Sequence, residues 1–298
     1  MSDFRLKVFQ SVARNLSFTK ASQELFITQP AITKHIQELE TQFKAQLFER
    51  LGNKISLTPA GKLLLEHSDR ILAGYKQLEY EMNMLNDEHS GELRLGASTT
   101  IAQYVLPSLL ALFTEKFPLV KLTLINGNSR DIEKALQEHR IDLGMVEGNI
   151  RLPNLKYTEF LQDELVPVVH THSKLAKLEE LSLEELKKTP LVLRERGSGT
   201  LDVLETALQT HNLKLSDLHI RMHLGSTESI KRFLENTECM GIVSIRSISR
   251  ELAAGLFKVI EIENLQLERS LSFVCLQGNE DSLIQFFQQF AFHYKDKL

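Results

Sequence analysis

Apolar residues between positions 19 and 40 recur at the three- and four-residue spacing of helices, in two short runs separated by a polar turn. The side chains expected to be buried are Ala21, Leu25 and Phe26 in the first run and Ala31, Ile32, Ile36 and Leu39 in the second. Pro30 suits the first turn of a helix, where its missing N–H costs nothing, so the second helix is expected to begin at the turn 27–29. The pattern predicts two packed amphipathic helices.

The open face of the second helix carries Gln29, Thr33, Lys34 and Gln37, which are side chains of the kinds that bind base edges and phosphates. This arrangement is typical of helix-turn-helix DNA readers, although packed amphipathic helices also occur in domains that bind no DNA. Charge gives mild support. Residues 1–62 contain nine Lys and Arg against five Asp and Glu, a net of about +4.

Residues 47–61 predict a two-stranded wing after this second helix. The turn-forming pair Gly52–Asn53 precedes the alternating run 55–57, and Thr58–Pro59 is a helix-start signal. Arg50 and Lys54 flank the turn and are expected to contact the DNA backbone, which gives general affinity with a strong dependence on salt.

A single long helix is predicted over residues 59–87. Its apolar side recurs at alternating steps of four and three residues, the spacing of a coiled-coil seam, at Leu64, Ser68, Ile71, Tyr75, Leu78, Met82 and Leu85. Such a seam offers more apolar surface than a small winged domain covers, so a second chain is the expected partner. The alternative is an amphipathic helix that lies on its own domain. Residues 63–89 hold two Lys and Arg against six Asp and Glu, which suits a rod held away from phosphates.

From about residue 91 the pattern changes to alternating strands and helices, which predicts an α/β region. The strand-like runs are Glu92–Gly96, Val120–Ile125, Ile141–Val146, Leu165–His170, Leu191–Arg194, Ile220–Leu224, Gly241–Ile245 and Leu271–Leu276. A helix is expected to run from Thr100 to about Phe117, and Ser182 with Glu185 forms a capping box at the start of another.

Two of these strands are followed by small hydroxylic residues at a helix start. Residues 97–100 read Ala-Ser-Thr-Thr, and residues 197–200 read Gly-Ser-Gly-Thr. Helix N-termini present free N–H groups, and Ser or Thr hydroxyls beside them complete an anion site, although such residues are more often plain caps. Gly197 and Gly199 make the second start more specific, because bare backbone allows close approach. One such site on each side of a cleft would hold a small carboxylate, phosphate or sulfur oxyanion.

Taken together, SFTKASQELFITQPAITKHIQELE, LFER and LTPAG resemble the N-terminal region of LysR-type transcriptional regulators, and the layout of the remaining chain is similar to that family along its whole length. The resemblance implies an α/β protein with an N-terminal winged helix-turn-helix at 1–58 and a long linker helix at 59–88. It further implies a two-lobed effector domain of periplasmic-binding-protein type at 91–298. Lobe I would comprise 91–162 and 268–298, and lobe II 163–267.

The resemblance also implies that the linker helix pairs antiparallel with its twin, and that the turns at Asn128, Glu147 and Thr227 line the effector cleft. Glu147 would repel an anion, so it would either lie aside or accept a hydrogen bond from a hydroxyl or amine of the effector. Leu201 follows the Gly-Ser-Gly-Thr run where similar sequences often have arginine. An anion is therefore expected to be held more by dipoles than by a full charge.

These inferences give three sets of candidate residues. The DNA-binding set is Thr19, Thr28, Gln29, Pro30, Thr33, Lys34, Gln37, Arg50, Asn53 and Lys54. The effector-binding set is Ser98, Thr99, Thr100, Asn128, Glu147, Gly197, Ser198, Gly199, Thr200 and Thr227. The dimerisation set is Leu64, Ile71, Tyr75, Leu78, Met82 and Leu85. The expected partners are a double-stranded DNA operator, a small effector, most simply an anion, and further copies of the chain as a homodimer or a dimer of dimers.

Other classes of protein find less support. No GxSxG, HExxH or GxxxxGK[ST] motif occurs, and the pair His170 and His172 has no third ligand nearby, so no enzyme, cofactor or metal is expected. A thiol-based redox regulator would need a reactive cysteine, but Cys239 and Cys275 lie beside or within apolar runs. A free-standing solute-binding protein would need export, and neither a signal peptide nor an apolar membrane span is visible, so a cytoplasmic location is expected.

Overall fold

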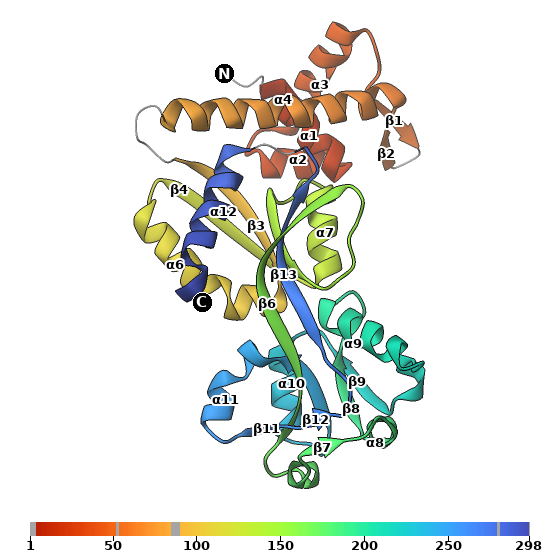
Figure 1. Ribbon diagram of the computed structural model, residues 1–298. Coiled ribbons are helices and arrows are strands. Elements are labelled where there is room, and N and C mark those ends of the chain that lie inside the picture. Colours follow the sequence, from red (N-terminus) through yellow and green to blue (C-terminus); the bar gives the residue numbers. More distant parts are fainter. Residues whose placement is uncertain (1–3, 52–53, 85–89, 279–280, 298) are drawn as a thin grey trace. The chain divides into compact units, whose positions relative to one another are not determined.

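The computed structural model describes residues 4–51, 54–84, 90–278 and 281–297. Asn53 of the DNA-binding set and Leu85 of the dimerisation set lie outside these residues. Two compact units are distinguished, residues 1–91 with 281–283, and residues 92–280 with 284–298. Each unit is described by itself below, with the labels of Figure 1.

The first unit is a helix-turn-helix followed by a hairpin and a long helix. Its elements are α1 Phe4–Asn15, α2 Phe18–Glu24, α3 Gln29–Phe43, β1 Phe48–Leu51, β2 Lys54–Leu57 and α4 Pro59–Met84. The predicted winged arrangement is confirmed, with β1 and β2 paired antiparallel. The Ser17 side chain caps α2 by accepting a hydrogen bond from the Lys20 N–H. Pro30 stands in the first turn of α3, as expected from its missing N–H.

One core holds this unit together. The residues buried in it, as their helical spacing predicts, are Ala21, Ile32, Ile36 and Leu39. Leu25 packs half-buried against the same core, and Ala31 is half-buried. Phe26 was expected there too, and this expectation is wrong, because its side chain is 94% exposed. The reason is local. Phe26 has a left-handed backbone, φ 54°, which ends α2 and turns its side chain away from the helical face.

Helix α4 is divided between two environments. Leu72 and Ser68 are buried and Leu64 packs half-buried against the core of the first unit. Ile71 is 44% exposed and Tyr75 is half-buried. Farther along the helix, Leu78 and Met82 are more than half exposed. The seam predicted from the sequence is thus covered by its own domain in its first turns, and its later apolar residues remain available to a partner.

The second unit is built on one mixed sheet. Its strands are β3 Gly91–Ser98, β4 Val120–Gly127, β5 Leu143–Glu147, β6 Leu155–His170, β8 Leu191–Arg194, β9 Ile220–Leu224, β10 Met240–Ser244, β11 Phe257–Val259 and β13 Glu268–Leu276. Their order is β4-β3-β5-β13-β6-β10-β8-β9, and β11 pairs with β6. A separate small pair joins β7 Glu180–Leu181 to β12 Glu261–Ile262.

Helices cover this sheet. They are α5 Thr99–Tyr104, α6 Leu106–Lys116, α7 Ser129–Gln137, α8 Leu183–Lys188, α9 Gly199–Thr210, α10 Thr227–Leu234, α11 Ser249–Ala253 and α12 Ser282–Tyr294. Short 3₁₀ helices occur at Lys174–Lys177, Leu215–Asp217, Ile245–Ser247 and Lys295–Lys297. The single helix expected from Thr100 to Phe117 is wrong. It is broken at Val105, and α6 begins there with Pro107 in its first turn.

Strand β6 runs through both lobes of the sheet and is shared by them (Figure 1). Its first half pairs with β13 in lobe I, and its second half pairs with β10 and β11 in lobe II. In lobe II, residues that alternate along β8 serve two cores. Leu191 and Leu193 pack in one core with α9, and Val192 packs in the other with α10. Lobe II is therefore a sheet with helices on both faces.

Candidate functional site

The α3 helix of the first unit presents its polar face to solvent. Thr28, Gln29, Pro30, Lys34 and Gln37 are exposed, and Thr33 is half-buried with its hydroxyl bonded to the Gln29 carbonyl oxygen. Thr19 at the start of α2 is exposed as well, and its hydroxyl donates to the side-chain oxygen of Gln29 at 3.3 Å.

This last contact joins the starts of α2 and α3. Gln29 is thereby oriented at the N-terminal end of α3, the end from which recognition helices contact bases. Arg50 and Lys54 lie on β1 and β2 of the hairpin.

In the second unit, most of the predicted effector residues are brought together where the lobes meet. Ser98 and Ser198 are fully buried, and Thr100 and Thr200 nearly so. Ser198 caps α9 by accepting the Leu201 N–H, so it is a cap as well as a candidate contact. The hydroxyls of Ser98 and Thr100 have no hydrogen-bond partner among the described residues. Buried hydroxyls without partners are uncommon, and here they point to a polar ligand.

The backbones of the two lobes touch at the glycine turn before α9. A Cβ atom on Gly199 would lie 2.1 Å from the Glu147 carbonyl oxygen, so only glycine permits this approach. The Arg130 N–H donates to the Gly197 carbonyl oxygen at 3.2 Å, from one lobe to the other. Gly197 itself has φ +90°, a conformation that favours glycine. The lobes are thus closed on each other at the two turns predicted to bind the effector.

A buried cluster of four charged residues and one threonine occupies this junction: Glu147, Asp163, Arg194, Arg269 and Thr200. The Arg269 Nη1 donates to the Thr200 hydroxyl at 3.0 Å and lies 3.5 Å from the Glu147 Oε1. Its Nε donates to the Asp163 Oδ2 at 2.7 Å, and the Asp163 Oδ1 accepts a hydrogen bond from the hydroxyl of Ser244. One guanidinium therefore bridges β13, β5, β6 and α9.

Arg194 supplies a second cation at the end of β8. It is 1% exposed, and its Nε and Nη2 donate to the carboxylate of Glu195. Its Nη2 also reaches the Thr99 hydroxyl across the lobes at 3.4 Å. The Nη1 of Arg194 has no partner among the described residues. Sequence analysis named neither buried arginine, but Glu195 pairs with Arg194, and Asp163 and Glu147 pair with Arg269. That an anion is held more by dipoles than by a full charge therefore stays a prediction.

The carboxylate of Glu147 lies among these groups with its Oε2 unpartnered in the described part of the chain. Burial raises its pKa above the ordinary value, while the guanidinium groups of Arg269 and Arg194 act in the opposite direction. A glutamate in this position can accept a hydrogen bond from a donor on the ligand. Sequence reasoning missed Asp163, Arg194 and Arg269. A charged residue ending or lying within an apolar strand would have been the signal.

Two predicted residues lie at the margins of the cluster. Asn128 caps α7 through a capping box with Asp131 and lies beside Gly197. Thr227 is buried at the start of α10. Its neighbour Glu228 belongs to a second cross-lobe group, the lobe-bridging group of Tyr104, Glu228, Lys231 and Glu251. The Tyr104 hydroxyl donates to Glu228, and the Lys231 Nζ lies 2.6 Å from both carboxylates.

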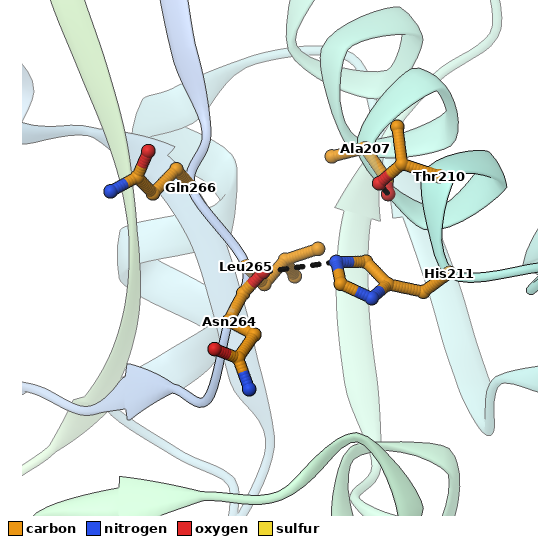
Figure 2. A pocket seen from close by; sticks show the side chains of 6 residues that line it. All are labelled: Ala207, Thr210, His211, Asn264, Leu265 and Gln266. Atoms are coloured by element: carbon orange, nitrogen blue, oxygen red, sulfur yellow. Dashed lines mark hydrogen bonds between the residues drawn. The ribbon is translucent and has the colours of Figure 1, made fainter.

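Pockets on the surface of lobe II do not coincide with this site. One, of about 350 Å³, lies between α9 and the loop 264–266, where His211 Nε2 donates to the Asn264 carbonyl oxygen at 2.9 Å (Figure 2). A more open groove of about 700 Å³ runs along β9 and α10. Neither is lined by a predicted effector residue. We therefore place the candidate site at the buried cluster, where Glu147 and Arg194 each have a buried side-chain atom without a partner among the described residues.

The alternative chemistries gain no support from the described residues. Cys239 and Cys275 are free and buried, and burial raises the pKa of Cys275, which disfavours its thiolate. His170 is buried against His172, and no group of three or more His, Cys, Asp or Glu in the described ranges could hold a metal ion. Of the helices described, none has the length and apolar character needed to cross a membrane.

Comparison with known proteins decides the family. Residues 4–62 match the model for bacterial regulatory helix-turn-helix proteins of the lysR family, and residues 86–293 match the LysR substrate binding domain. The chain belongs to the LysR family. It is thus a DNA-binding transcriptional regulator with an effector-binding domain, as the sequence resemblance predicted.

Individual relatives and structures agree with this assignment. A probable RuBisCO transcriptional regulator of Thalassiosira pseudonana is 32% identical over 275 residues, covering 91% of this chain and 90% of the relative. A full-length OxyR of Pseudomonas aeruginosa has the same fold, with a TM-score of 0.73 at 15% identity over 98% and 93% of the two chains. The Synechocystis CcmR regulatory domain in complex with 2-PG has a TM-score of 0.62 at 26% identity, covering 68% of this chain and 97% of that domain.

Proposed function

We propose that this LysR-family regulator reads an operator with α3 and the hairpin 48–57 and changes its DNA binding when a small anion occupies the junction between the lobes. The three-part division at 1–58, 59–88 and 91–298 is part of this proposal. Helix α4 would pair with the same helix of a second copy, as a homodimer or within a dimer of dimers. A regulator that binds operator DNA in this way would work in the cytoplasm.

The observation that carries the effector site is the set of buried polar atoms near the lobe junction that have no partner among the described residues. Arg194 Nη1 is a donor without a partner among the described residues, on a guanidinium whose Nε and Nη2 are bonded to Glu195, and Ser98 and Thr100 offer hydroxyls. The start of α9 adds backbone N–H groups beside Ser198. These groups suit an anion. Glu147 Oε2 is an acceptor in the same place, so the ligand would also carry a hydroxyl, amine or protonated oxygen. CcmR, whose regulatory domain was solved with 2-PG, supports a small molecule in this domain.

Effector binding would act by favouring one arrangement of the lobes. A ligand that binds the closed form more tightly shifts the equilibrium toward it by its differential affinity. In an oligomer such a shift would alter the spacing of the DNA-reading heads, which links the two sites without any direct contact between them.

DNA reading is tested first. The full-length protein would select its preferred duplex from a randomised library, and gel shifts would compare that duplex with unrelated DNA. We expect Gln29→Ala to weaken binding to the selected duplex by about 1–3 kcal/mol and to spare unrelated DNA. Equal losses on both DNAs would reject a base-reading role for Gln29. Arg50→Ala should instead weaken both and lower the salt dependence.

Effector binding is tested by a thermal-shift screen of small anionic metabolites, because a ligand that binds only the folded state raises its apparent stability. Calorimetry with the ligand found would then compare the wild type with Thr100→Val and Ser198→Leu. Both substitutions are expected to prevent ligand binding and to leave DNA binding intact. Normal affinity in both variants would place the effector elsewhere, with the lobe surfaces between subunits as the next candidate.

A further inference from the structure

Phe26 in the turn between α2 and α3 combines two unfavourable features. Its ring is 94% exposed, and its backbone is left-handed at φ 54°. The turn itself is well ordered by backbone hydrogen bonds, from the Phe26 N–H to the Gln23 carbonyl oxygen and from the Ile27 N–H to that of Ser22. These hydrogen bonds at the end of α2 fix the left-handed backbone of Phe26. In that backbone conformation its side chain points into solvent.

Both features oppose stability of the free protein. Helices that end in a left-handed residue most often use glycine there, because a Cβ atom is strained in that conformation. An aromatic ring left in water gains nothing from the hydrophobic effect. Leu16 and Lys44 of the same unit are left-handed too, so the feature that points to a function of the Phe26 side chain is the almost complete exposure of its ring in a strained turn.

The position of Phe26 indicates which function. It stands three residues before Gln29, the N-terminal residue of α3, and the Thr19–Gln29 hydrogen bond joins the starts of α2 and α3. The exposed side chains of Lys20 and Lys34 on these two helices supply positive charge suited to a phosphate backbone. The surroundings of Phe26 are therefore those of the surface proposed to face DNA.

We propose that Phe26 is an apolar DNA contact that packs against a thymine methyl group at the edge of the sequence read by α3. Phenylalanine is among the side chains that contact this methyl group in the major groove. The inference rests on the proposed DNA-reading function and adds to it a residue outside the polar face of α3.

The test uses the duplex that the full-length wild type selects from a randomised library. Phe26→Gly is expected to raise the thermal midpoint of the protein, because glycine relieves the backbone strain, and yet to weaken binding of that duplex roughly tenfold or more. Leu16→Gly is the matched control. Leu16 is also left-handed, φ 45°, and 49% exposed in the same unit, and its replacement should raise the midpoint while changing affinity less than about twofold.

Deoxyuridine, which lacks the methyl group, identifies the contact. Replacing each thymine of the selected duplex in turn should reveal one position at which the wild type loses about fourfold in affinity, the value of one methyl group. In Phe26→Gly the same replacement should have no effect. Unchanged affinity of Phe26→Gly, an equal loss on unrelated DNA, or a lower mass in light scattering would each overturn the proposal, the last by showing a contact between copies. A wild type that selects no sequence would overturn the DNA-reading function itself.

Discussion

The residues proposed to contact DNA and those proposed to contact the effector lie in opposite environments. Gln29, Lys34 and Gln37 project from α3 into solvent, with few interactions to hold them. Thr100 and Arg194, in the second unit, are almost completely buried between lobes that touch through backbone atoms. The first surface is accessible to a partner, whereas the residues of the second are enclosed by protein.

This difference in burial determines whether a polar side chain contributes to binding alone or also to the stability of the fold. On an exposed helix face a substitution should change binding and leave the free energy of unfolding almost unaltered. In the lobe junction a charged residue such as Arg269 contributes to folding, because it is paired with the buried carboxylates of Asp163 and Glu147.

The largest effect is expected on helix α4, where exposed apolar residues are proposed to become buried on assembly. Replacing Ile71 and Leu78 together by Asp would place unpaired charges in the interface between two copies and should separate the dimer into monomers. Light scattering measures the mass. Lys62→Asp, nine residues before Ile71 and so on the opposite side of the helix, is the control and should leave the mass unchanged. A double variant of unchanged mass and unchanged operator affinity would mean that this face has no partner chain.

Arg269→Met tests the buried cluster. Removing the guanidinium leaves Asp163 and Glu147 buried without their common cation, and the free energy of unfolding should fall by about 3–5 kcal/mol. Because the chain has no tryptophan, urea unfolding is followed best by circular dichroism. The exposed counterpart, Lys34→Met, should change the free energy by less than about 0.5 kcal/mol. If the two variants were equally stable, the contrast between the buried and exposed sites would fail.

A helix cap remote from both sites gives the scale for a purely structural change. The Ser182 hydroxyl caps α8 in the predicted capping box. Ser182→Ala should lower the free energy of unfolding by about 1 kcal/mol and alter neither DNA binding nor the effector response. A changed response would show that stability and binding are coupled more widely than the lobe junction.

The smallest effect is expected from the pH dependence of the lobe-bridging group. Burial acts to raise the pKa of Glu228, but hydrogen bonds from Lys231 and Tyr104 hold it below its ordinary value of 4.5. Such a carboxylate stabilises the fold above its unfolded pKa, and this contribution is lost as pH falls through the folded pKa. The wild type should therefore lose stability below about pH 4.5 more steeply than Glu228→Gln, with a difference under about 1 kcal/mol at neutral pH because Glu228 is 46% exposed. Parallel curves in acid unfolding would rule out this role.

The parts of the fold that the sequence predicted depend on local patterns. The two helices of the reader, the hairpin and the long α4 follow from periodicity and turn residues close together in the chain. The first half of β6, residues 155–164, was missed because polar residues such as Lys156, Glu159 and Gln162 interrupt its apolar positions. Its partner strand β13 begins more than 100 residues later, and no local signal reports that pairing.

The same limit applies to the candidate site. Ser98, Thr100 and Ser198 could be found because a hydroxyl beside a helix start is visible in the sequence itself. Asp163 and Arg269 are 106 residues apart, and their ion pair exists only because β6 and β13 are neighbours. A charged residue in a strand ordinarily faces solvent, so its burial depends on the tertiary fold.

The long strands β6 and β13 tether the two lobes to each other. Because each lobe remains covalently attached, closure is an intramolecular step in which one lobe meets the other at a high effective concentration. The pairing of β13 with β6 is irregular between Leu271 and Ser272, where the register shifts at a bulge. Under this arrangement each 1.4 kcal/mol of differential contact shifts the ratio of open to closed forms about tenfold. A ligand of only a few atoms therefore supplies enough free energy to change the ratio of open to closed forms of a 34.0 kDa chain.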